Sequence, residues 1–431
     1  MNRYSKHRVV FVFLIVSFLV DGRSSLCLST PISALPELTQ LIGEALSHNK
    51  EIKSIQDRIE SLKETVVFEG SLPDPKLGIA LLNLPTDSFQ FDEQPMTQKQ
   101  LFISQMFPWF GKLDLKLQIA SIKVLRQEAL LDVKRLEISR GVATAYYELW
   151  FIKKSKEINN RLTNIIDQIL KVSETGYETG RVLQHDIFRA QVELSKLTDE
   201  QIDLNNRYRV GEDKINALIN RSGYVPVILS DKLEYPDVKL NLDALNELAL
   251  KQNPWVKIKQ LEVDSAKIII DLAKKDYWPD MNAKVSYGQR DKDINGKDFD
   301  DFFSASLEVN IPLWKKTRQD RQLASAVKAY DSSDKMYENF TETLPHNIDA
   351  LVSEIHDAQT RFMLFRDSLI PQARQWAISS LSAYEVGKIE FNTMIDAQIR
   401  LLRFELQADN YLFMIYKKRA EIEEVIGGPV L

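Results

Sequence analysis

The stretch GYETGRVLQHDIFRAQVEL, residues 176–194, decides the fold because a second version of it, AYEVGKIEFNTMIDAQIRL, occupies residues 383–401. The two versions align at a constant separation of 384 − 177 = 207 residues. The aligned pairs are Tyr177 with Tyr384, Glu178 with Glu385, Gly180 with Gly387, Ala190 with Ala397 and, further on, Leu218 with Val425. Self-similarity of this kind marks a duplicated structural unit. We therefore predict two copies of one helical hairpin.

The duplication also sets the predicted division of the chain. Weaker matches continue upstream, where residues 41–52 resemble residues 245–256. A Pro-Asp pair at residues 73–74 recurs at residues 279–280. The predicted parts are a signal peptide (1–29), a first repeat (30–222) with its tip near 176–182, a linker (223–241), and a second repeat (242–431) with its tip near 383–389.

Composition indicates long helices. Only 15 of the 431 residues are Gly, which is about half of the usual share. The run from Leu113 to Thr175 contains no proline, so we expect a single helix of roughly sixty residues and about 90 Å. Compact domains seldom contain a helix of that length, which favours an elongated molecule.

Apolar residues around the tips follow a heptad spacing, typical of helices that pack in coiled-coil fashion. The three stripes are Ile158, Leu162, Ile165, Ile169 and Val172; Ile187, Ala190, Leu194 and Leu197; and Met394, Ala397, Leu401 and Phe404. An ordinary helical bundle would show the same stripes, so the spacing alone leaves both architectures open.

Each repeat also contains two segments in which apolar and polar residues alternate. The alternation is clear at residues 281–288 and 303–311 and weaker at residues 76–83 and 99–107. A period of two over eight to ten residues is what a strand with one face to lipid and one to a lumen requires. A soluble hairpin would also fit any one of these segments.

Aromatic residues close the second strand of each pair. Trp109 and Phe110 follow Pro108, and Trp314 follows Pro312 at the matching place in the second repeat. Aromatic residues, Trp above all, form belts at the headgroup level of membranes. We predict that these three aromatic residues form an interface belt, although a buried structural role would fit each of them alone.

Four strands are too few to close a barrel, for which about eight is the smallest workable number. Open strand edges are not tolerated in lipid. We therefore expect copies of this chain to complete one another's sheet as an oligomer.

The N-terminal residues have the layout of a secretory signal. Arg3, Lys6 and Arg8 precede an apolar run at residues 9–20 that is too short to span a bilayer. We expect the mature chain to begin between Leu28 and Ala34. The alternative is that Cys27, the only cysteine, is retained as a lipid-anchored first residue.

With the repeat, the strand pairs and the tips YETGR and YEVGK, the sequence resembles the TolC-type outer membrane efflux proteins from about residue 35 to residue 428. The segment PDPKLGIALLNLPTDSFQFDEQPMTQKQLFISQMFPWFGKL (73–113) is most similar to the branch that serves heavy-metal-cation pumps.

This resemblance implies a mainly α fold with a transmembrane β portion. Three chains would form a periplasmic α-barrel and a 12-stranded outer-membrane β-barrel. The homotrimer would conduct substrates, heavy-metal cations among them, from an inner-membrane resistance-nodulation-division pump through a periplasmic adaptor to the exterior. It would bind no cofactor.

The resemblance also implies roles at the tips. The adaptor would dock at Thr179, Gly180, Arg181, Val386, Gly387 and Lys388. A latch would join Tyr384 and a neighbouring basic residue to Asp186. The family's basic position falls on Ile389, with Lys388 adjacent. Its two constricting acidic positions fall on Thr393 and Asp396, so only Asp396 is acidic here.

Other function classes find little support. The net charge of −5 provides no basic footprint for nucleic acid. The five histidines show no paired helical spacing and the eight methionines no cluster, which argues against a built-in transition-metal site. Phosphate-binding loops, nucleophile triads and dinucleotide fingerprints are absent, so no enzyme is expected. A periplasmic coiled-coil adaptor or scaffold remains the alternative, and a secreted enzyme is third.

Overall fold

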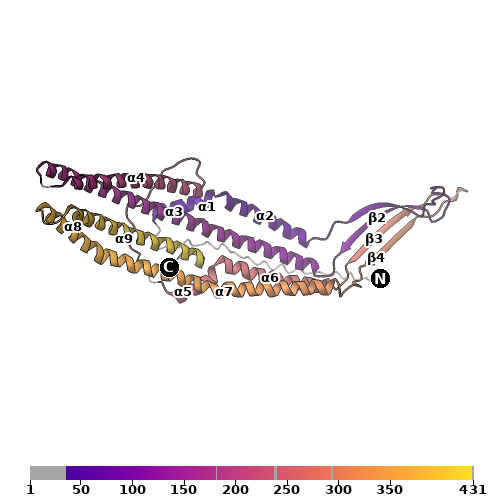
Figure 1. The fold of residues 1–431 in the computed structure, drawn as a ribbon. Coiled ribbons are helices and arrows are strands. Elements are labelled where there is room, and N and C mark those ends of the chain that lie inside the picture. The colour runs from indigo at the N-terminus through magenta and orange to yellow at the C-terminus, as the bar shows by residue number, and fades with distance from the viewer. Residues whose placement is uncertain (1–34, 181, 237–239, 293–294, 430–431) are drawn as a thin grey trace, which may run out of the picture.

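A computed structural model describes residues 35–180, 182–236, 240–292 and 295–429. The predicted signal peptide, Cys27 and Arg181 lie outside these residues. The molecule is elongated, with a long helical body and a β-sheet that projects from one end (Figure 1). The two hairpin tips lie at the opposite end of the helical body.

The elements occur twice in the same order. The first repeat contains α1 (Pro36–His48), α2 (Lys50–Gly70), β1 (Lys76–Leu82), β2 (Gln98–Phe107), α3 (Lys112–Glu178) and α4 (Gln184–Ile219). The second contains α5 (Leu242–Gln252), α6 (Pro254–Lys275), β3 (Met281–Gln289), β4 (Phe302–Val309), α7 (Gln319–Leu364), the π-helical segment η1 (Phe365–Leu369), α8 (Ile370–Glu385) and α9 (Phe391–Ile426). The mainly helical fold with four strands confirms the predicted fold class.

Matching helices have matching lengths and caps. α4 and α9 each have 36 residues. The side chains of Asn49 and Asn253 accept hydrogen bonds from the first free N–H groups of α2 and α6, which stabilises these helix starts. The predicted long helix is confirmed as α3, with 67 residues.

The second long helix is interrupted. α7, η1 and α8 together span residues 319–385, which is 385 − 319 + 1 = 67 residues, as in α3. The interruption lies directly before Pro371, whose ring nitrogen has no N–H to donate to the preceding turn. A π-helical insertion of this kind is common at functional sites. No such insertion is found in α3.

The four strands form one antiparallel sheet in the order β1-β2-β3-β4. The predicted strand at 303–311 ends early, at Val309. One further hydrogen bond in the same register follows, from Asn310 N–H to Asp280 O at 3.1 Å, and Pro312, which has no N–H, cannot continue the ladder. β1 and β4 are the two edges of the sheet, each with one neighbour.

The sheet has one apolar face and one polar face. Residues paired across strands share a face, and the register places Ile79 beside Leu101, and Leu101 beside Tyr287. The exposed apolar face consists of Leu77, Ile79, Leu81, Leu101, Ile103, Val285, Tyr287, Phe303 and Leu307. On the other face the side chain of Gln100 donates to Ser286 Oγ at 2.9 Å, and both residues are buried.

A buried ion cluster joins the sheet to the helices. Lys112 Nζ lies 3.0 Å from carboxylate oxygens of both Asp276 and Asp280. Asp280 also accepts the backbone N–H of Trp109 at 2.7 Å. Because Lys112 is buried, loss of either partner would leave part of its charge uncompensated.

The main core lies where both repeats meet in the middle of the helical body, around the fully buried Trp150 and Tyr146. The linker packs against it. Ser230 N–H donates to the Tyr146 hydroxyl at 3.0 Å, and the Tyr416 hydroxyl donates to Glu234 O at 2.8 Å. The linker is therefore tied to helices of both repeats.

The heptad prediction is partly wrong in register. The buried residues of α3 near the tip are Ile158, Leu162, Ile166, Ile169 and Ser173. Ile166 and Ser173 are fully buried, whereas Val172 is 61% exposed. These buried positions advance by an average of (173 − 158)/4 = 3.75 residues, which is longer than the 3.5-residue period of a left-handed coiled coil.

No helix among the described residues is both long and apolar enough to cross a membrane.

Candidate functional site

Both hairpin tips have the same backbone geometry. Gly180 and Gly387 adopt φ = +71°, a conformation that side-chain-bearing residues rarely take. Each N–H donates to the carbonyl of the tyrosine three residues earlier, Tyr177 or Tyr384, at 2.9 Å. The duplicated glycines thus end α3 and α8 in the same way.

The space around the two tip glycines is open. A Cβ atom at either position would meet no other atom within 4 Å. Thr179, Val386 and Lys388 are also exposed. Within this chain, glycine is therefore needed at these positions for the positive φ and not for close packing. The surface of the tips is accessible to another molecule.

Behind the tips, Tyr384 and Asp186 lie in the same region. Asp186 is buried beneath the first tip and lies 3.1 Å from His185 Nε2. The Tyr384 hydroxyl is enclosed, and no hydrogen bond to it is found among the described residues. Burial raises the pKa of this phenol; the Asp186 carboxylate adds to the shift and Ser173 opposes it. The two proposed latch residues are thus neighbours without a direct hydrogen bond.

The residues around Tyr384 explain the missing basic position. Ile389 packs against the apolar cluster behind the tips, and Tyr384 meets Phe391 edge-on with ring centroids 5.8 Å apart. A basic side chain at position 389 would have to lose its hydration there. Lys388, next to it, is exposed.

Thr393 and Asp396 lie on the exposed face of α9. Met394 and Ile395, between them in sequence, are almost completely buried. Residues three apart lie on the same face of a helix, so Asp396 is presented to solvent one turn after Thr393.

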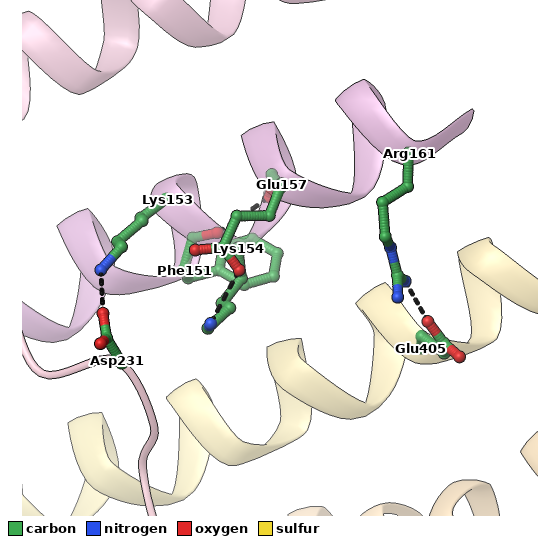
Figure 2. Close-up of polar contacts among 8 residues, drawn as sticks. Phe151, Lys153, Lys154, Glu157, Arg161, Asp231 and Glu405 are labelled. Carbon is green, nitrogen blue, oxygen red and sulfur yellow. Dashed lines mark hydrogen bonds and ion pairs between the residues drawn. The ribbon is translucent and has the colours of Figure 1, made fainter. Parts of the chain in front are cut away.

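An ion network further from the tips joins the two hairpins. Arg161 of α3 bonds to Glu405 of α9 (Figure 2). Arg374 of α8 reaches the same carboxylate at 3.3 Å. Along α3, Lys153 binds Asp231 of the linker at 2.8 Å. Three helices and the linker are thus connected by charged contacts at this level.

Asp409 lies one turn beyond Glu405 on α9. Burial raises the pKa of its carboxyl group to about 6. Repulsion by Glu405 and Glu157 adds to this shift, whereas Lys154 and Arg161 oppose it. The carboxyl group therefore changes charge in the slightly acidic range.

Sequence reasoning missed this network because its members are far apart in the chain. Arg161 and Glu405 are 244 residues apart, and no local pattern pairs them. It also missed Trp278, which stacks on Trp109 with ring centroids 5.0 Å apart. The only available signal for Trp278 was its place two residues before Asp280, at the start of a predicted strand.

The predicted belt residues lie at the junction between sheet and helices. Phe110 and Trp314 are largely exposed, and Trp109 is half-buried by its stack on Trp278. No group of three or more His, Cys, Asp or Glu side chains with a metal-binding arrangement occurs in the part of the chain that the structure describes.

Comparison with known proteins identifies the family. The outer membrane efflux protein family matches residues 41–221 and again residues 245–428. The chain belongs to this family, which consists of outer membrane channels for efflux. The predicted family resemblance is therefore confirmed.

Three proteins illustrate the relationship. The cobalt-zinc-cadmium resistance protein CzcC of Cupriavidus metallidurans is 18% identical over 325 residues, which is 74% of each chain. The outer membrane protein VceC of Vibrio cholerae has the same fold with a TM-score of 0.74 and 17% identity, over 91% of this chain and 96% of that one. The open state of the Neisseria gonorrhoeae MtrE outer membrane channel matches with a TM-score of 0.73 and 15% sequence identity, over 91% of this chain and 89% of that one.

The buried carboxyl group of Asp409 predicts a pH-dependent stability. A folded-state pKa raised to about 6 favours the protonated form, so its contribution to stability is complete below about pH 4 and is lost as the pH rises through about 6. Asp409→Asn should raise the free energy of unfolding by about 1–3 kcal/mol at pH 7.5 and hardly at pH 4. Denaturant unfolding at both pH values measures this.

Asp199→Asn is the matched control for this experiment, because Asp199 is exposed on α4 and should have no effect at either pH. An Asp409→Asn variant with the stability of the unmodified protein at pH 7.5 would contradict the buried, uncompensated state of this carboxyl group.

Proposed function

We propose that three copies of this chain form one outer-membrane β-barrel that continues as a periplasmic tunnel. Substrates would pass through it passively out of the cell. The observation that carries this proposal is the sheet, which combines an exposed apolar face with two unpaired edges, β1 and β4. In lipid the backbone groups on such edges need partners. Pairing β4 of one copy with β1 of the next gives 3 × 4 = 12 strands, enough for an open barrel.

The alternative, a periplasmic coiled-coil adaptor or scaffold, fits the sheet poorly. In water the exposed apolar side chains of β1 to β4 would form a large patch, which invites aggregation. In a lipid bilayer the same side chains are in a favourable environment.

The tips are the proposed docking site for a periplasmic adaptor. In a trimer the two equivalent tips of each chain would form a near-sixfold ring around the axis. Thr179, Gly180 and Arg181 of the first tip, with Val386, Gly387 and Lys388 of the second, would contact the adaptor. The open space at both glycines supports a close approach of a partner's backbone. An inner-membrane pump of the resistance-nodulation-division type would supply the energy.

Metal cations are the proposed cargo. CzcC, whose name describes cobalt, zinc and cadmium resistance, supports this choice. A ring of three Asp396 side chains, exposed on α9, would favour cations where the tunnel is narrowest. No resident metal is needed, because a channel requires weak sites that ions can leave.

The gate would act between the hairpins. Tyr384 of the second hairpin and Asp186 of the first, which interact electrostatically, would form its latch together with Lys388. Arg161 and Glu405 join the same hairpins further along. Movement of α8 and α9 away from α3 would open the tunnel, and the π-helical segment before α8 provides a local irregularity where α8 can bend.

The oligomer is the first test of this function. Native mass spectrometry of the purified protein in detergent should give a trimer, and the same preparation should form channels in planar bilayers. A stable, folded monomer that forms no channels would contradict the proposal, because its strand edges would have to be satisfied within one chain.

The tip glycines provide a test of adaptor docking. Gly180→Leu with Gly387→Leu should abolish metal export from cells while trimers still form, since there is open space around a Cβ atom at both positions and the positive φ costs only about 1–2 kcal/mol at each site. Gly43→Leu is the control, at another open position, in α1. If export persists in the double variant, the adaptor does not dock at the tips.

The constriction has a separate test. Asp396→Asn should lower the preference of the channel for cations over anions, measured as the reversal potential across a salt gradient in planar bilayers, because three negative charges are removed. Asp57→Asn, an exposed carboxylate on α2, should leave the reversal potential unchanged. If the reversal potential is also unchanged in the Asp396 variant, Asp396 does not line the constriction.

A further inference from the structure

A cluster of apolar and basic side chains follows β4 directly. Ile311, Leu313 and Trp314 are 72%, 74% and 75% exposed. Four exposed cations come next in the sequence: Lys315, Lys316, Arg318 and Arg321. We call these four residues the basic collar.

The basic collar carries uncompensated charge. No carboxylate of the described residues forms an ion pair with any of its four side chains. Asp320, the only acidic residue within the stretch, accepts instead a hydrogen bond from the Tyr277 hydroxyl at 2.5 Å. Four cations and one engaged carboxylate therefore give residues 312–321 a net charge of 4 − 1 = +3.

The backbone holds this stretch in a defined shape. The N–H groups of Thr317 and Arg318 both donate to Trp314 O, at 3.2 and 3.1 Å, and the N–H of Asp320 donates to Lys315 O at 2.9 Å. Successive turns thus keep the cations next to the exposed tryptophan. Because the backbone is already ordered, binding loses less conformational entropy than it would with a flexible loop.

The equivalent stretch of the first repeat differs in charge. Residues 108–117 contain Lys112, Lys116 and Asp114, a net charge of 2 − 1 = +1. Lys112 is buried and bonded to both Asp276 and Asp280. The positive surface is therefore specific to the second repeat and is not a consequence of the duplication.

The position of the basic collar agrees with a membrane surface. It lies between β4 and the start of α7, at the end of the sheet that joins the helices (Figure 1), and Asp320 within this stretch bonds to Tyr277, the neighbour of the exposed Trp278. Aromatic side chains of this kind sit at the headgroup level, and nearby lysines and arginines extend toward phosphate groups.

We propose that Lys315, Lys316, Arg318 and Arg321, together with Trp314, bind the headgroups of anionic phospholipids in the leaflet that faces the helical tunnel. This inference rests on the proposed function, because it requires the sheet to lie in the membrane. The apolar side chains enter the acyl region, and the cations bind the phosphates at the boundary. Three copies would present three such surfaces around one barrel.

The test uses purified mature protein in a non-ionic detergent, titrated with phosphatidylglycerol or with phosphatidylcholine, and native mass spectrometry counts the lipids bound per trimer. Phosphatidylglycerol should bind about tenfold more tightly than phosphatidylcholine, because each cation near the surface adds to the attraction. The variant K315Q/K316Q/R318Q/R321Q should bind both lipids equally.

A control variant neutralises four exposed cations that form no ion pair and lie away from the sheet: Lys53, Arg58, Lys257 and Lys335. Each is at least about 18 Å along its helix from the sheet end, beyond the screening length of about 10 Å at 0.1 M salt. This variant should keep the full preference for phosphatidylglycerol.

The inference would be overturned if the unmodified trimer showed no lipid preference, or if the collar variant kept its full preference. It would also be overturned if inorganic phosphate displaced phosphatidylglycerol at constant ionic strength, because that result would indicate a site for soluble anions. Channel formation is measured in a bilayer of phosphatidylcholine with the same preparations. Trimers that conduct without lipid preference contradict this inference alone, whereas monomers without conductance contradict the proposed function itself.

Discussion

Backbone hydrogen bonding in a medium without water is the constraint on which the rest of this structure depends. The described part of each chain contains four strands, and within it the outer edges of β1 and β4 have no partner. The face formed by side chains such as Ile79 and Phe303 is too apolar for water, yet an open edge is too polar for lipid. In the proposed trimer, association of copies through these edges would resolve both problems, and the long helices would continue the closed sheet as a tunnel.

Duplication supplies two similar units, and the differences between them are where function is expected. α3 is a single helix, whereas its counterpart contains a π-helical segment before Pro371. Lys112 of the first repeat is buried in an ion cluster, whereas the matching stretch of the second repeat exposes the basic collar. One repeat thus provides the continuous scaffold, and the other carries an irregular helix and a charged surface.

The contact between the hairpins is polar as well as apolar. Near the tips, apolar side chains such as Ile166 and Met394 fill the space between the helices. Further along, Arg161 and Glu405 join α3 to α9, and the Asp409 carboxyl group is held partly buried nearby. Burial of a carboxylate without a bonded cation reduces stability. In the proposed gate, such a contact makes the closed form less strongly favoured than a fully apolar contact between the hairpins would be.

The sequence alone determined the repeat, the long helices, the four alternating segments and the family, because each depends on residues close together or on a constant separation such as that of Gly180 and Gly387. It also located the tips, whose geometry follows from a glycine with positive φ. Only the tertiary structure decided which residues meet across the chain. In α3 the fully buried positions near the tip are Ile166 and Ser173, whereas the predicted Ile165 is only partly buried and the predicted Val172 is exposed, because the burial follows a longer period than the heptad. The pairing of Arg161 with Glu405 was likewise not predictable, since packing between the repeats sets it and local spacing carries no information about it.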